Sequence, residues 1–247
     1  MPATVQPNPT DPTPPPKQII AMGGGGFSME PDNLLLDRYI LEQAHIADPT
    51  VCFLPTACGD ADSYIVRFYA AFSTLPCRPR HLSLFRQPPN LEAIVSGCDV
   101  IYVGGGNTRN MLAIWRAAGL DALLRRAWEN GTILCGLSAG AICWFEQGHT
   151  DSAGSLDPMA CLGFLAGSCT PHYDGEPGRR PSYHALVQHG ALQAGYAMDD
   201  GAALHFIGNK LAHVVTSRPE ACAFHVRCEG GEVIEEPLQT RFLNQTS

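Results

Sequence analysis

A serine stands between two glycines in the sequence Gly136-Leu137-Ser138-Ala139-Gly140. This G-x-S-x-G pattern follows a short apolar run and precedes a helix-like one, which is the setting of a nucleophile at a sharp strand-to-helix turn. Such a turn exposes the serine hydroxyl, and the glycines avoid clashes that a Cβ would cause. The N–H of Ala139 would face the same point and could stabilise an oxyanion. The alternative interpretation is a glycine-rich turn without chemistry.

A serine nucleophile needs a base within hydrogen-bonding reach, and histidine is the usual one because its pKa lies near neutrality. The chain has nine histidines. Most of them lie in predicted strands or helices, where a structural or surface role is expected. His149 and His172 lie instead in the irregular segment after the serine. Either one is a candidate base, and the Pro171 and Tyr173 neighbours of His172 indicate a tightly held loop.

The base needs an acid to orient it, and Asp199 and Asp200 stand in a turn before a predicted strand. Aspartates also cap turns without any catalytic role, so both interpretations stay open. The chain order would be Ser, His, Asp. That order differs from the Ser, acid, His order of α/β-hydrolases and counts against a lipase or esterase.

A scaffold for these residues is indicated by five short apolar runs, each followed by turn residues and a helix-like stretch. Such runs, alternating with helices, predict a parallel sheet covered on both faces. The runs occupy 18–22, 51–54, 81–85, 100–103 and 132–135, and the helices are expected at 32–47, 60–74, 90–96, 109–118, 120–130 and 181–194. Three runs end in small-residue loops, which should meet the serine turn at the carboxyl ends of the strands.

The pattern changes after the serine. Residues 147–178 are rich in Gly, Pro, Asp and His, with little periodicity, and are expected to form a long functional or disordered loop. Four further short strands are predicted at 203–206, 211–215, 223–228 and 233–236. We expect them to form an antiparallel extension on one edge of the sheet. That edge offers a surface for pairing in a homo-oligomer.

Composition limits the class of protein. The chain has 247 residues, 45% of them hydrophobic and 16% charged, and a net charge of −8, which argues against a nucleic-acid surface. No apolar run approaches a membrane span. The ten scattered cysteines favour a reduced cytoplasm over a disulfide framework. Residues 1–16, rich in Pro, are expected to be a disordered tail, and 17–247 a single α/β domain.

Three segments resemble the peptidase E family of serine dipeptidases, which has the cyanophycinases as relatives. They are residues 103–108, Val-Gly-Gly-Gly-Asn-Thr, residues 136–141, Gly-Leu-Ser-Ala-Gly-Ala, and Pro171-His172. The resemblance covers most of the chain from about 18 to about 215. It implies a flavodoxin-like, doubly wound α/β fold with a mostly parallel sheet, related to class I glutamine amidotransferases. Those relatives carry Cys where this chain has Ser138, so glutamine amidotransfer is disfavoured.

The resemblance also implies roles, position by position. Ser138 matches the nucleophile and His172 the base. Asp200 matches the third member, which is Glu in the best-known peptidase E, and Asp151 is a second candidate for that role. The oxyanion would be held by the N–H groups of Gly106 and Ala139. No metal or organic cofactor is implied.

Peptidase E removes an N-terminal aspartate from dipeptides, so the resemblance implies a small peptide substrate. Arginine suits its carboxylate because the guanidinium forms a planar fork. Arg179 and Arg180 both stand where the family carries a substrate-binding arginine, and the amide of Asn107 could contribute. Asp174 and Glu176 could receive the substrate's amine. The alternatives are a cyanophycinase-like hydrolase of β-Asp-Arg polymer and a non-catalytic binding protein on the same fold.

Overall fold

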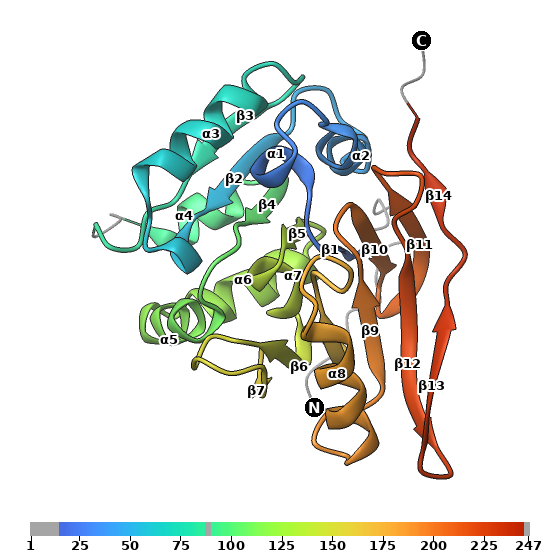
Figure 1. Cartoon of the computed structure of the whole chain (residues 1–247). Coiled ribbons are helices and arrows are strands. Elements are labelled where there is room, and N and C mark those ends of the chain that lie inside the picture. The colour runs from blue at the N-terminus through green and yellow to red at the C-terminus, as the bar shows by residue number, and fades with distance from the viewer. Residues whose placement is uncertain (1–14, 87–89, 245–247) are drawn as a thin grey trace, which may run out of the picture.

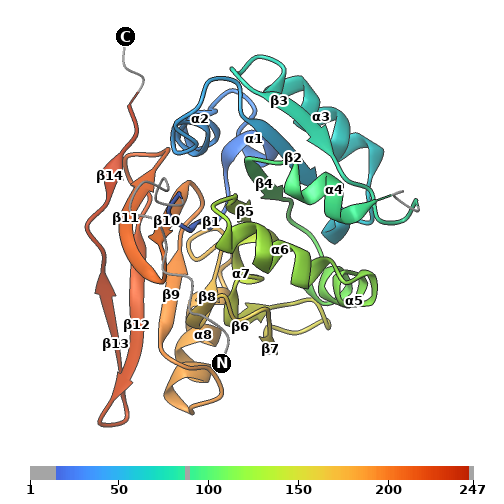
Figure 2. The same cartoon turned by 180° about the vertical axis from the view of Figure 1, so that it is seen from behind.

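Two sheets form the scaffold of the chain, as a computed structural model shows (Figures 1 and 2). The structure describes residues 15–86 and 90–244. The predicted tail, 1–16, lies outside the described residues except for its last two prolines. No helix in the described part is long and apolar enough to cross a bilayer.

The main sheet has the order β14-β11-β10-β1-β5-β4-β2-β3. The five strands in the run β1-β5-β4-β2-β3 are mutually parallel. On the other side of β1, β10 is antiparallel to β1, β11 is antiparallel to β10, and β14 is parallel to β11. The strands are β1 (Gln18–Met22), β2 (Thr50–Leu54), β3 (Arg78–His81), β4 (Val100–Val103), β5 (Ile133–Leu137), β10 (Ala202–Ile207), β11 (Lys210–Thr216) and β14 (Arg241–Phe242). The predicted parallel sheet is thus present.

Helices cover both faces of this sheet, because its central strands are apolar on both sides. Ile19 and Ala21 of β1 pack on one side, and Ile20 and Met22 on the other. The first side is covered by α4 (Leu91–Ser96), α5 (Thr108–Ala118) and α6 (Leu120–Glu129), and the second by α1 (Gly26–Met29), α2 (Leu35–Glu42) and α3 (Asp62–Phe72). A short 3-10 turn, η1 (Thr56–Cys58), follows β2. This is the doubly wound arrangement expected from the sequence.

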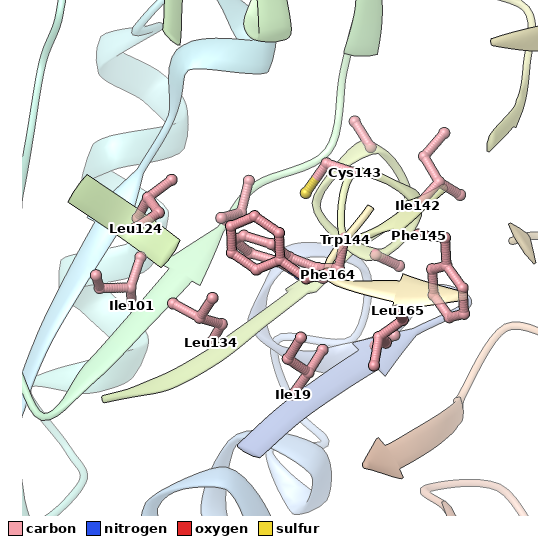
Figure 3. Packing of buried hydrophobic residues seen from close by; sticks show 14 of the residues in the cluster. Ile19, Ile101, Leu124, Leu134, Ile142, Cys143, Trp144, Phe145, Phe164 and Leu165 are labelled. Atoms are coloured by element: carbon pink, nitrogen blue, oxygen red, sulfur yellow. The ribbon is translucent and has the colours of Figure 1, made fainter. Parts of the chain in front are cut away.

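A second sheet has the order β13-β12-β9-β8-β6-β7 and lies beside the first (Figure 1). Its strands are β6 (Phe145–Thr150), β7 (Asp157–Ala160), β8 (Leu165–Thr170), β9 (Gly195–Met198), β12 (Ala223–Glu229) and β13 (Glu232–Pro237). The short helix α7 (Ala139–Ile142) connects the two sheets, and α8 (Arg179–Gln188) packs on the second. The beginnings of β6 and β8 are packed into the core of the main sheet by four side chains, Trp144, Phe145, Phe164 and Leu165 (Figure 3).

The sequence-based prediction was wrong for residues 147–178, which contain most of β6 and all of β7 and β8 rather than one long loop. Hydropathy did not reveal these strands because several buried side chains in them are polar. His149, Ser168 and Thr170 are all buried, and His149 and Thr170 are joined by a hydrogen bond of 2.9 Å. Buried polar groups satisfied in this way remove the apolar signal that marks a strand.

Two further predictions need correction. The third strand was expected at 81–85, but β3 spans Arg78–His81, a mostly exposed edge strand that needs no apolar run. The C-terminal strands do not all extend one edge. Of the four predicted strands, two correspond to β10 and β11 of the main sheet, whereas the other two are β12, which pairs with β9 in the second sheet, and β13, which pairs with β12.

Candidate active site

The candidate residues lie where the chain passes between the two sheets. Ser138 follows β5 of the main sheet and leads through α7 into β6 of the second. Asp200 lies in the return crossing, between β9 and β10, and His172 follows β8. In the main sheet, β1 has β5 on one side and β10 on the other. The serine and the aspartate therefore flank the carboxyl end of β1.

Ser138 adopts a backbone conformation that L-residues rarely occupy, with φ 55° and ψ −115°. Its N–H donates to the Met22 carbonyl at 3.2 Å, and its own carbonyl accepts from Ala141 at 2.9 Å and Ile142 at 3.0 Å, which starts α7. A residue held this way is characteristic of the sharp turn that exposes a nucleophile. The predicted strand-to-helix turn is therefore present at Ser138.

Both motif glycines are required by the closeness of β4. A Cβ on Gly136 would lie 2.5 Å from the Val103 carbonyl oxygen, and one on Gly140 would overlap that same oxygen. The main chain of β4 thus passes too close to the turn for any side chain. The G-x-S-x-G pattern is explained here by packing against one carbonyl.

Two backbone N–H groups near Ser138 have no backbone acceptor in the part of the chain that the structure describes. They belong to Gly106, after β4, and Ala139, after β5. The loop of Gly106 lies against the serine, since a Cβ on Gly105 would be 3.3 Å from the Ser138 Cβ. The Tyr64 hydroxyl accepts from the Gly105 N–H at 3.3 Å and holds this loop. Free donors beside a nucleophile are the elements of an oxyanion hole.

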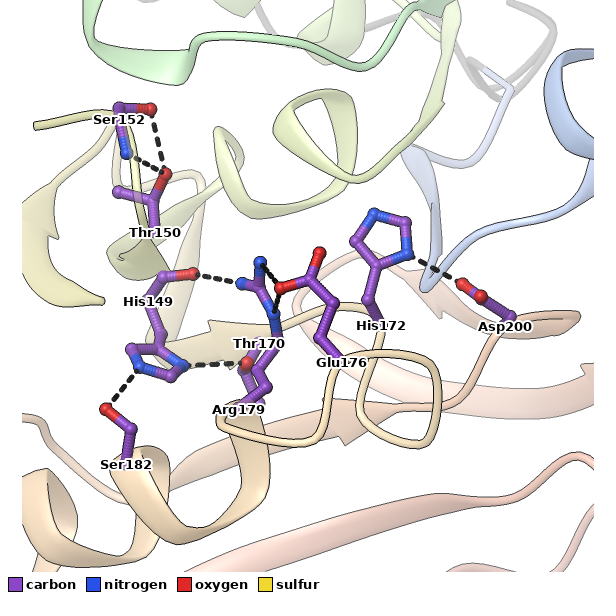
Figure 4. A network of polar contacts seen from close by, with 9 residues as sticks. All are labelled: His149, Thr150, Ser152, Thr170, His172, Glu176, Arg179, Ser182 and Asp200. Atoms are coloured by element: carbon purple, nitrogen blue, oxygen red, sulfur yellow. Dashed lines mark hydrogen bonds and ion pairs between the residues drawn. The ribbon is translucent and has the colours of Figure 1, made fainter. Parts of the chain in front are cut away.

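His172 is joined to Asp200 by a hydrogen bond of 2.6 Å between Nδ1 and Oδ1 (Figure 4). His172 has a positive φ of 51°, and the loop is held by the Tyr173 N–H, which donates to the Met198 carbonyl at 3.0 Å. The Asp200 N–H donates to Asp174 at 2.8 Å. An acid that accepts from Nδ1 fixes the imidazole and leaves Nε2 to act as the base.

The charge of Asp200 is maintained by its surroundings. Burial by itself raises the pKa of this carboxyl. The hydrogen bond from His172, together with the positive charges of His172, Arg218 and Arg179, outweighs burial and brings the pKa below its ordinary value. Asp200 is therefore an ionised acceptor near neutral pH. Sequence reasoning missed Arg218, and no sequence signal distinguishes it from other surface arginines.

The end of β1 connects the serine to the histidine–aspartate pair. Ser138 donates to Met22, and Gly201 donates to the Gly24 carbonyl at 3.1 Å. Gly24 also forms a β-bridge with Asp200, and a Cβ on Gly24 would overlap the Asp200 carboxylate. Within the described residues, the Ser138 hydroxyl makes no hydrogen bond to His172. Catalytic hydrogen bonds of this kind often tighten only when substrate binds.

The alternative base and acids occupy other positions. His149 is fully buried, with Nδ1 2.9 Å from the Thr170 hydroxyl and Nε2 3.1 Å from that of Ser182. Burial and the charge of Arg179 lower the pKa of His149 to about 4, so it is a neutral structural residue. Asp199 accepts from the Cys222 N–H at 2.9 Å, and Asp151 is exposed. Neither is the acid bonded to His172.

The two candidate arginines bond to different carboxylates. The buried Arg179 donates to Glu176 through Nε at 2.9 Å and Nη2 at 2.6 Å (Figure 4). Arg180 is exposed, forms an ion pair with Glu235 of β13, and lies over the ring of Tyr173. Arg179 is thus the one whose guanidinium is held in the network beside His172.

The Asn107 side chain is engaged within the fold. Its Oδ1 accepts from the Asn110 N–H at 2.9 Å and caps α5, while Nδ2 donates to the Ser152 carbonyl at 3.1 Å. One amide hydrogen remains for a ligand. The described residues contain no cluster of three or more His, Cys, Asp or Glu side chains arranged to hold a metal ion.

Comparison with known proteins identifies the family. The sequence profile of Peptidase family S51 matches residues 19–214. This chain belongs to peptidase family S51. The "Uncharacterized peptidase YgaJ" of Bacillus subtilis (strain 168) is 59% identical to this S51 peptidase over 228 residues, covering 92% of this chain and 99% of its own length.

Solved structures of similar fold support the architecture of this S51 peptidase. A peptidase from an acI-B1 Actinobacterium superposes with a TM-score of 0.70 at 16% identity, covering 91% of this chain and 95% of the other. A Listeria monocytogenes EGD-e protein assigned as a peptidase E has a TM-score of 0.58 at 20% identity, with 91% and 100% covered. At these identities the likeness concerns the fold. The expected α/β fold and the resemblance to the peptidase E and cyanophycinase family are confirmed.

Proposed function

We propose that this S51 peptidase is a serine exopeptidase that hydrolyses dipeptides with an N-terminal aspartate, using Ser138, His172 and Asp200. The observation that carries the proposal is the 2.6 Å hydrogen bond between His172 and Asp200. Asp200 forms a β-bridge with Gly24 just after β1, and the strained turn of Ser138 lies on the other side of the same strand end. That arrangement supports the assignment of His172 as the base, Asp200 as its orienting acid and the half-buried Ser138 as the nucleophile.

The reaction would proceed through an acyl-enzyme. His172 Nε2 takes the proton of the Ser138 hydroxyl as the oxygen attacks the aspartyl carbonyl carbon. The N–H groups of Gly106 and Ala139 stabilise the tetrahedral oxyanion. His172 then gives the proton to the leaving amine as the C–N bond breaks. Water, deprotonated by His172, releases aspartate and restores Ser138.

Recognition of the aspartate side chain is proposed for Arg179. Its guanidinium is buried and held in the same network as His172, and its charge acts on Asp200. A planar fork in a buried setting suits a carboxylate. Arg180 points to Glu235 instead, so we propose no substrate contact for it. The remaining amide hydrogen of Asn107 could contribute a second donor.

Hydrolysis of aspartyl-p-nitroanilide, compared with the alanyl, leucyl and glutamyl analogues, tests this function. We expect the aspartyl compound to be preferred and the Ser138→Ala variant to lose nearly all activity. Wild-type rates in Ser138→Ala would refute the mechanism. Release of β-Asp-Arg from cyanophycin, with no cleavage of the anilides, would instead favour the cyanophycinase-like activity. Labelling of Ser138 by a fluorophosphonate would distinguish either hydrolase from a binding protein.

A further inference from the structure

The guanidinium of Arg179 is already occupied by groups of the protein itself. Nε and Nη2 both donate to Oε2 of Glu176, at 2.9 and 2.6 Å, and Nη1 donates to the His149 carbonyl at 3.1 Å (Figure 4). Among the described residues, Glu176 is the one carboxylate paired with this arginine. The fork that a substrate carboxylate would bridge is therefore filled by Glu176.

The two partners differ in their freedom to move. The Arg179 side chain is only 4% exposed, whereas that of Glu176 is 46% exposed. Arg179 is also fixed by the carbonyl of His149, a residue buried between Thr170 and Ser182. The Glu176 carboxylate can rotate into water, whereas the Arg179 guanidinium stays buried and then needs another carboxylate to pair with it. A substrate carboxylate can therefore pair with Arg179 only after the Glu176 carboxylate has moved away.

Glu176 is also coupled in position to the base. Its N–H donates to the His172 carbonyl at 3.1 Å, and its own carbonyl accepts from the Arg179 N–H at 2.9 Å. His172, Glu176 and Arg179 thus belong to one short hydrogen-bonded turn. A carboxylate that replaced Glu176 on Arg179 would lie next to the loop that carries the base.

We propose that Glu176 is a specificity-determining residue that competes with the substrate's side-chain carboxylate for Arg179. This rests on the proposed function, since it names the group that an acidic substrate must displace. The exchange replaces one carboxylate–guanidinium pair by another, so the net gain from an acidic side chain is small. As long as Glu176 is paired with Arg179, acidic substrates bind more weakly. The advantage in KM of N-terminal aspartate over an uncharged N-terminal residue is therefore smaller than it would be without Glu176.

The role suggested for Glu176 by the sequence, capture of the substrate's amine, predicts the opposite result. If Glu176 held the amine, its removal would raise KM for every substrate with a free N-terminus. If it competes for Arg179, its removal lowers KM only for acidic substrates. The sign of the change therefore distinguishes the two roles.

The kinetic test is Glu176→Gln with aspartyl- and alanyl-p-nitroanilide. We expect KM for the aspartyl compound to fall about fivefold, the scale of losing a partly exposed ion pair, with kcat and the alanyl KM unchanged. A matched control is Glu92→Gln, which removes the carboxylate partner of Arg126 on an exposed surface and should change neither KM. An unchanged or higher aspartyl KM in Glu176→Gln would overturn the proposal.

A binding test separates this proposal from the hydrolytic function. Succinate, a dicarboxylate without an amine, is titrated calorimetrically into Ser138→Ala and into Ser138→Ala combined with Glu176→Gln or Glu176→Ala, with folding checked by circular dichroism. We expect about fivefold tighter binding in the combined variants. That result supports the competition even if no anilide is cleaved, which would refute only the proposed function. Equal or weaker succinate binding would overturn the competition.

Discussion

The imidazole of His172 and the carboxylate of Asp200 meet at 2.6 Å although they are 28 positions apart in the sequence. The contact exists because β8 and β9 are parallel neighbours in the second sheet, so the segments that follow them emerge at the same edge. Gly24 lies against the Asp200 carboxylate and leaves room for it. The carboxylate of Asp200 is thereby placed beside the imidazole of His172 by the pairing of two short strands.

Replacing Asp200 by asparagine should lower kcat by about 10³- to 10⁴-fold, because the amide no longer favours the His172 tautomer with Nε2 free. KM should change little, since Asp200 makes no proposed substrate contact. Steady-state kinetics on aspartyl-p-nitroanilide measure both. Asp151→Asn is the control, and the exposed Asp151 should give wild-type kinetics. A larger loss in Asp151→Asn than in Asp200→Asn would reverse the assignment.

Replacing Gly140 by alanine should destabilise the protein by about 1–3 kcal/mol, the usual scale for overpacking. The new Cβ would overlap the Val103 carbonyl oxygen, so either the Ser138 turn or β4 must shift. Urea unfolding monitored by circular dichroism measures the loss. Gly178→Ala is the control, because its Cβ would find only Leu156 Cδ1 at 3.9 Å. Equal stability of the two variants would contradict the packing explanation.

Asp37 should make stability fall as the pH rises. It is fully buried beneath the glycine-rich loop, where Oδ2 accepts from the Phe27 N–H at 2.8 Å and Oδ1 has no partner among the described residues. Burial raises the pKa of Asp37 from 3.8 to about 7. Between these two pH values the folded state binds more protons than the unfolded state. The contribution of Asp37 to the free energy of unfolding is therefore largest below about pH 4, falls as the pH rises, and is lost at about pH 7.

The corresponding measurement compares wild type and Asp37→Asn in urea at several pH values. Three pH units correspond to about 4 kcal/mol as an upper bound. The wild type should lose stability relative to the variant from pH 4 to 7, and their difference should be constant above pH 8. Taking the difference removes the contributions of other titrating groups. Parallel curves across the whole range would show that Asp37 is ionised in the folded protein.

Glu235 of β13 should support the loop that carries His172. Its Oε2 accepts from the Tyr173 hydroxyl at 2.5 Å and lies 2.8 Å from His184 Nε2, and the carboxylate also pairs with Arg180. Glu235→Gln removes the charge that binds these donors, so we expect a lower Tm and a kcat reduced about three- to tenfold through misplacement of His172.

Glu229→Gln, on the same hairpin, is the control for this prediction. Glu229 pairs only with the surface residue Arg227 among the described residues, and its replacement should change neither Tm nor kcat. Differential scanning fluorimetry and anilide kinetics provide the two measurements. If Glu235→Gln kept wild-type kcat while Tm fell, the hairpin would stabilise the fold without positioning the base.

Much of the main sheet could be predicted because its apolar runs, turns and helical patterns all indicate the same alternation of strands and helices. Each of β1, β2, β4 and β5 is a buried apolar run followed by a turn and a helix, so periodicity alone locates it. The serine turn was equally predictable, since only glycine fits beside the Val103 carbonyl. The second sheet was largely missed. Its strands bury polar residues such as Ser168, which lies 2.7 Å from the Tyr183 hydroxyl, and a satisfied polar core has no hydropathy signature.

The sequence by itself determined the turn at the candidate nucleophile Ser138 and the doubly wound sheet, because these depend on neighbours within a few residues. It left two candidates for each of three roles. These were His149 or His172 as the base, Asp151 or Asp200 as the orienting acid, and Arg179 or Arg180 as the arginine that binds the substrate. Only the tertiary structure decided which of each pair lies in the His172 network, since hydrogen bonds and buried charge depend on which strands pair. Residues close in sequence, such as Arg179 and Arg180, point to different carboxylates. Residues far apart, such as His172 and Asp200, are joined by a hydrogen bond.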